Sequence, residues 1–95
     1  MIFGQTTKGA FKMTYTTVIR TSGKQFIGTS SNAFKSGLEA KKQMLLQLQK
    51  APKRVHISMA LSLGDTEIFR SHGMAMTSVF WSFKQKLGEM KMSKV

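Results

Sequence analysis

A chain of 95 residues is long enough for one domain with a single core, and its 41% of hydrophobic residues excludes a disordered chain. The absence of cysteine excludes disulfides, thiolate metal sites and a thiol nucleophile. Fifteen Lys and Arg against four Asp and Glu give a formal net charge of +11, which attracts polyanions such as nucleic acids.

The first predicted element is a β-hairpin over about residues 11–20 and 24–29. Both segments are rich in Thr, Val, Ile, Tyr or Phe, and Ser22-Gly23 between them suits a two-residue turn that places Ile19 opposite Phe26. The face expected to enter the core carries Phe11, Met13, Tyr15, Ile19 and Phe26.

A helix is predicted next, from about residue 32 to 50. Ser31 or Asn32 can cap its N-terminus, and Pro52 stops it. Its apolar stripe, which we expect to face the core, comprises Phe34, Leu38, Leu45 and Leu48.

Lys41 occupies a position of this stripe where the spacing calls for a hydrophobic residue. One interpretation is structural: Met44 on the adjoining flank turns the buried face away from Lys41, whose stem then lies at the edge of the core. The other is that Lys41, with its neighbour Lys42, contacts an anionic group.

Residues 53–63 alternate between apolar and polar, which predicts a half-buried strand with Val55, Ile57, Met59, Leu61 and Leu63 on its core face. Gly64-Asp65 turns the chain, and residues 66–71 are predicted to form the partner strand. After Gly73, expected to be a break, a helix over about 75–91 carries a stripe of Met76, Phe80, Phe83, Leu87 and Met90.

The order of these elements predicts an α+β fold in one domain, residues 1–95, with residues 1–10 as an N-terminal arm. In this β-β-α-β-β-α arrangement, two helices cover one face of a mostly antiparallel sheet. No run of about 18 apolar residues and no signal peptide is present, so we expect no membrane partner and an intracellular location, cytoplasmic or nucleoid-associated.

Trp81, the single tryptophan, lies outside the stripe of the last helix, one turn before Lys84. An aromatic ring beside ammonium groups is typical of proteins that bind single-stranded nucleic acid. The competing interpretation is that Trp81 packs against the arm, on Ile2 and Phe3, or across a homodimer interface.

A basic corner, defined by Lys50, Lys53 and Arg54, follows the first helix, and loops of this kind bind phosphates. Alternatively, these cations are solvated and stabilise the carbonyl end of the helix. The polar face of the first hairpin is a further candidate for phosphate binding, or an ordinary solvent face. It carries Lys12, Thr14 and Thr16, with Arg20 in line and Lys24 beyond the turn.

Catalysis has little support in the sequence. His56 and His72, with Asp65, Glu67 and Arg70, have the residue types of a nuclease site, but no known nuclease motif is present. No metal-ligand spacing and no phosphate-binding loop occurs, so we expect no metal and no cofactor.

Together these features predict a small basic accessory or regulatory protein, not an enzyme, that binds DNA or RNA mainly through phosphates. The expected contacts are Lys41, Lys42, Lys50, Lys53, Arg54, Trp81 and Lys84. One alternative is a modulator that docks an acidic surface of a larger protein, since eight methionines suit adaptable protein contacts. A small ribonuclease-like toxin is the third.

Overall fold

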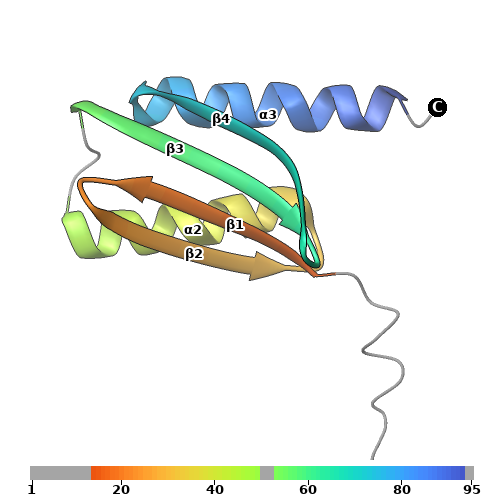
Figure 1. Cartoon of the computed structure of the whole chain (residues 1–95), viewed down its shortest axis with the longest axis horizontal. Helices are drawn as coiled ribbons and strands as arrows, with labels where there is room; N and C mark the ends of the chain where they lie inside the picture. The colour runs from red at the N-terminus through yellow and green to blue at the C-terminus, as the bar shows by residue number, and fades with distance from the viewer. Residues whose placement is uncertain (1–13, 50–52, 94–95) are drawn as a thin grey trace, which may run out of the picture.

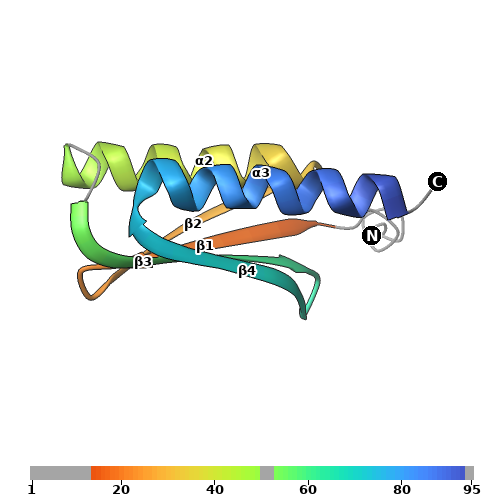
Figure 2. The ribbon, with the colours of Figure 1, turned by 90° about the horizontal axis from the view of Figure 1, so that it is seen from above.

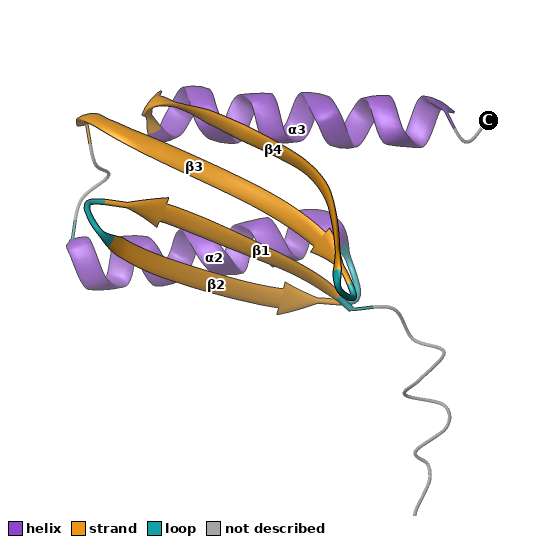
Figure 3. Cartoon of the chain, viewed as in Figure 1, coloured by secondary structure: helices purple, strands orange, loops and turns teal. Residues whose placement is uncertain are grey.

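Two hairpins, each followed by a helix, make up the computed structural model, which describes residues 14–49 and 53–93 (Figure 1, Figure 3). The strands form one antiparallel sheet in the order β2-β1-β3-β4, and both helices lie on the same face of it (Figure 2). The predicted α+β fold is therefore confirmed. The elements are β1 Tyr15–Thr21, β2 Lys24–Ser30, α2 Ala33–Leu48, β3 Lys53–Leu63, β4 Thr66–Ala75 and α3 Met76–Ser93.

The β1–β2 hairpin has the predicted turn and register. Ser22 and Gly23 both have positive φ, 54° and 74°, as a tight hairpin turn with two central residues in the left-handed region requires. Ile19 pairs with Phe26, and both side chains are buried beneath the helices. Local turn chemistry thus fixes which face of the hairpin enters the core.

Helix α2 is capped by Asn32, whose side-chain oxygen accepts a hydrogen bond of 3.0 Å from the backbone N–H of Lys35. Its C-terminus comes one turn before Pro52: Gln49 adopts φ 66° and donates its backbone N–H to the Leu45 carbonyl at 2.8 Å. The left-handed residue ends the helix before the proline is reached.

The buried face of α2 differs from the predicted stripe. The small residues Ser36, Gly37 and Ala40 carry the close contact with the sheet, and Met44 is buried one turn further on. A Cβ atom on Gly28 of β2 would overlap the backbone of Ser36 and Ala40, so helix and strand meet backbone to backbone. This approach excludes large side chains from that face and turns Phe34 and Leu38 out of the core, where they are 38% and 41% exposed.

A buried hydrogen bond locks this orientation of α2. The hydroxyl oxygens of Thr17 on β1 and Ser36 lie 2.7 Å apart. Because Ser36 donates its own proton to the Ala33 carbonyl, Thr17 is the donor. Rotation of α2 would leave the fully buried Thr17 hydroxyl without this acceptor, which is costly.

The β3–β4 hairpin departs from the prediction at its open end. Val55 is not on the buried face, because Arg54 has φ 63° and the pairing shifts between Lys53 and Ile57. Strand β4 also continues past residue 71 to Ala75, and Gly73 is part of it.

Gly73 pairs with Ile57 and allows α3 to fold back against its own strand. A Cβ at Gly73 would lie 3.2 Å from a methyl group of Val79, and the Ser71 hydroxyl donates to the Val79 carbonyl at 3.2 Å. The chain therefore passes directly from strand to helix without a loop.

The stripe of α3 is confirmed: Met76, Phe80, Phe83 and Leu87 are buried, and Met90 packs at their edge. Helix α3 covers β3 and β4, whereas α2 covers β1 and β2. Neither helix, as far as the structure describes them, has the length and apolar content to cross a membrane.

Candidate nucleic-acid interface

Helices α2 and α3 run in opposite directions along the same face of the sheet (Figure 1, Figure 2). The rings of Phe34 on α2 and Phe80 on α3 have centroids 5.9 Å apart. We call the surface between the facing flanks the interhelix groove. It comprises Phe34, Leu38, Lys41, Phe80, Trp81 and Lys84.

One end of the groove opens into a cavity of about 580 Å³. Asn32, Phe34 and Lys35 line it from the start of α2, and Lys84 and Gly88 line it from α3. The facing flanks of the two helices thus leave space beside two lysines.

Lys41 has a structural partner in the groove. Met44 is fully buried and Lys41 only partly, as the structural interpretation requires. The Lys41 ammonium lies over the Phe80 ring, 4.6 Å from its centroid, which is a cation–π contact. This contact keeps the charge at the floor of the groove, next to the exposed Lys42.

Trp81 lies on the groove flank of α3 and is 60% exposed. It precedes Lys84 by three residues and Gly88 by seven, a spacing that places all three on one side of a helix. Lys84 and Gly88 line the cavity together with α2, so this side faces α2. The arm residues Ile2 and Phe3, on which the packing interpretation depends, lie outside the described residues.

The described carboxylates lie away from the groove. Glu39 is on the opposite flank of α2, above Gly28 of β2, and accepts a hydrogen bond from Gln43. Glu89 follows Lys86 by one turn, on the flank of α3 where the Lys86 ammonium lies 5.9 Å from the Phe69 ring centroid. Asp65 and Glu67 belong to the β3–β4 hairpin. The positive potential of the groove lysines is therefore not neutralised locally.

Arg54, the one residue of the basic corner whose side chain is described, is not part of the groove. Arg54 is exposed beyond the C-terminal end of α2, whereas the cavity is at its N-terminal end. Lys50 lies outside the described residues, and of Lys53 only the backbone is described. The structure thus brings Lys41, Lys42, Trp81 and Lys84 to the helix face of the molecule. Arg54 lies apart from them, beyond the opposite end of α2 from the cavity.

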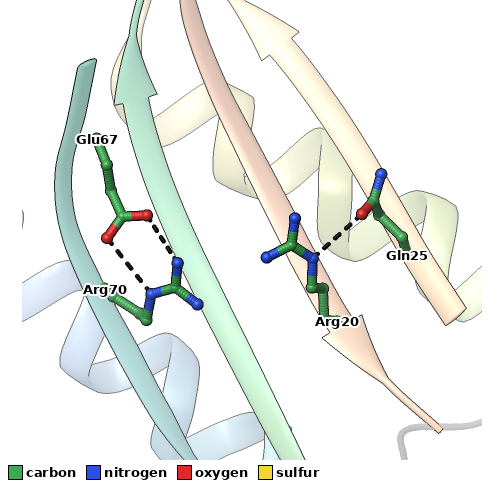
Figure 4. Close-up of polar contacts among 4 residues, drawn as sticks. All are labelled: Arg20, Gln25, Glu67 and Arg70. Atoms are coloured by element: carbon green, nitrogen blue, oxygen red, sulfur yellow. Dashed lines mark hydrogen bonds and ion pairs between the residues drawn. The ribbon is translucent and has the colours of Figure 1, made fainter. Parts of the chain in front are cut away.

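Four of the residues considered for catalysis, His56, Glu67, Arg70 and His72, lie on the face of the sheet that the helices do not cover. His56 and His72 have ring centroids 5.6 Å apart. Arg70 is occupied by Glu67, with its Nη2 donating to a carboxylate oxygen at 2.7 Å (Figure 4). Asp65 is in the turn after β3, so the five residues do not form one site.

The Glu67–Arg70 pair makes stability depend on pH. The hydrogen bond from Arg70, with smaller electrostatic contributions from Arg70 and Arg20, holds the Glu67 pKa below its ordinary value of 4.5. A carboxyl whose pKa is lowered by folding stabilises the folded state when ionised, and this contribution is lost as the pH falls through the folded pKa. We expect Glu67→Gln to lower the free energy of unfolding at neutral pH and to have no effect in acid well below the folded pKa, measured by denaturant titration. An equal effect at both pH values would contradict this origin.

No family model, curated protein or solved structure matches the chain.

Proposed function

We propose that the protein is an accessory or regulatory protein that binds single-stranded nucleic acid in the interhelix groove, with little sequence specificity. One observation carries the proposal. Trp81, mostly exposed, shares a flank with Lys84, faces the flank that carries Lys41, and has no described carboxylate nearby.

The lysines supply attraction and the aromatic rings supply stacking. Ammonium groups neutralise phosphates without reading base edges, whereas a planar fork such as arginine would be needed for bidentate recognition of guanine. The indole of Trp81 presents a face on which any unpaired base can stack. A duplex hides these base faces, so single strands should bind more tightly than duplexes of the same length.

Salt dependence follows from the number of lysines. If Lys35, Lys41, Lys42 and Lys84 each neutralise one phosphate of a single strand, the affinity should fall about 50-fold between 50 and 200 mM salt. The measurement is fluorescence anisotropy of a labelled oligothymidine, with the emission of Trp81 followed in parallel. Quenching of this emission on binding would place a base at the indole.

Lys84→Ala and Lys86→Ala provide a matched pair, because both remove one charge from α3 but on opposite flanks. We expect Lys84→Ala to weaken binding about fivefold and to lower the salt slope by about 0.7, and Lys86→Ala to leave the slope unchanged. Trp81→Ala should cost about tenfold in affinity. Equal effects of the two lysine variants would contradict binding in the groove.

A second candidate function is supported by the exposed apolar residues beside the lysines. Leu46 is 64% exposed, and Leu38 lines a shallow hollow with Lys41 and Lys42. Such a surface also fits an acidic, amphipathic protein segment. In that case Leu38→Ala and Leu46→Ala would weaken partner binding, and nucleic acid would compete poorly.

A further inference from the structure

A row of polar side chains crosses the face of the sheet that the helices do not cover. Arg20 on β1 pairs with Ser58 on β3, which pairs with His72 on β4. Paired residues in an antiparallel sheet point to the same face, so the three side chains stand side by side, about 4.8 Å apart from strand to strand. His56, two residues before Ser58, is on the same face and in ring contact with His72. We call these four residues the sheet row.

Ser58 has the shortest side chain of the row and lies between Arg20 and His72. It is only 8% exposed, and its hydroxyl, which makes no hydrogen bond among the described residues, still reaches solvent. A hydroxyl that reaches solvent between two longer side chains is free to bind a ligand oxygen.

The side chains on either side of Ser58 offer further hydrogen-bond donors. Arg20 donates its Nε to Gln25 at 3.1 Å, which leaves its two terminal amino groups without a partner among the described residues (Figure 4). His56 and His72 are both exposed, and their rings contact each other. A phosphate above Ser58 could accept from the guanidinium, the hydroxyl and an imidazole, while a base stacks on the second imidazole ring.

The nearest charged groups do not block this position. Arg70 and Glu67 are paired with each other, two to five residues along β4 from His72. Arg20 also lowers the pKa of Glu67, so the positive charge of Arg20 interacts with that carboxylate. The side chains of His56 and His72 are exposed to solvent.

We propose that the sheet row is a second phosphate site for nucleic acid, and that the protein joins two strands, one on each face of the sheet. This rests on the proposed function of the interhelix groove. Because the sheet lies between the groove on its helix-covered face and the row on its other face (Figure 2), a short strand bound in the groove cannot reach the row. Two short strands per chain should therefore bind independently.

The test uses two oligothymidines of about ten nucleotides, one with a donor fluorophore and one with an acceptor, which cannot pair with each other. Energy transfer between them should rise to a maximum near two strands per protein chain and fall with excess protein. Anisotropy of one labelled strand reports binding in the groove separately, and sedimentation at the same concentrations shows that the protein is monomeric.

Arg20→Ala is compared with Lys24→Ala, which removes the same charge from the same hairpin but from the other face, since Lys24 pairs with Thr21. We expect Arg20→Ala, and His56→Gln with His72→Gln, to weaken the second strand about tenfold and to abolish energy transfer at low strand concentration. Lys24→Ala should retain it.

A stoichiometry of one strand per monomer, or equal energy transfer in Arg20→Ala and Lys24→Ala, would overturn the second site. Neither result would contradict binding in the groove. Energy transfer that requires a protein dimer would overturn it as well. Absence of any anisotropy change in the wild-type protein would instead contradict the proposed function itself.

Discussion

Replacing Gly28 by alanine should destabilise the protein by about 2 to 3 kcal/mol. The added Cβ would overlap backbone atoms of Ser36 and Ala40, and a helix backbone cannot move aside as a flexible side chain can. Helix α2 must then shift away from β2, which also lengthens the buried hydrogen bond between Thr17 and Ser36. Urea unfolding followed by far-UV circular dichroism measures the loss.

Gly88→Ala is the matched control, because it adds the same methyl group where nothing lies within 4 Å. Gly88 is inside α3, where alanine favours the helix by about 0.5 to 1 kcal/mol over glycine. The same substitution should therefore have opposite signs at the two positions. A neutral Gly28→Ala variant would show that α2 does not approach β2 as closely as described.

Phe83→Ala should cost about 3 to 5 kcal/mol, the usual range for removal of a buried aromatic ring. Phe83 is fully buried, its ring centroid is 5.7 Å from that of Phe69 and 5.8 Å from that of Phe80, and Gly37 of α2 leaves room for it. Phe83 joins α2, α3 and β4, so no single element can move to fill the cavity that its removal leaves. Since a domain of this size is stable by only about 5 to 15 kcal/mol, the variant loses a large part of its stability.

Trp81→Ala is the control on the same helix. A residue that is 60% exposed should contribute no more than about 0.5 kcal/mol to stability, whereas its loss should weaken nucleic-acid binding. If Trp81→Ala destabilises the fold as much as Phe83→Ala, the indole is packed in the intact protein, and stacking on a base is wrong. Calorimetry of both variants decides between the two roles.

Local signals in the sequence were sufficient to predict most of the fold. The turn at Ser22-Gly23, the alternation of residues 57–63 and the stripe of α3 each depend on residues close together in the chain, and the structure agrees with all three. The buried face of α2 could not be predicted in this way. It is set by Gly28, a residue of another element, and close backbone contact there selects small side chains over the large apolar ones that hydrophobicity favours.

The same distinction applies to the candidate sites. Lys41, Trp81 and Lys84 could be selected as unusual residues from spacing alone, but their placement around one groove depends on the rotation of α2. The row of Arg20, Ser58 and His72 depends on the pairing of β1 with β3, which the order of elements does not determine. The small residues Ser36, Gly37 and Ala40 were the available signal for the rotation of α2.

The contact of α2 with the sheet through small residues also bears on how this surface can change. The residues that hold the helix, such as Ser36 and Ala40, are on one flank, and those that form the groove, such as Phe34, Leu38 and Lys41, are on another. Substitutions of the α2 residues of the groove should therefore alter affinity with less cost in folding than substitutions of Ser36 or Ala40. Because of this separation, many substitutions of the binding surface should be tolerated. Ligand preference can therefore change while the fold stays the same.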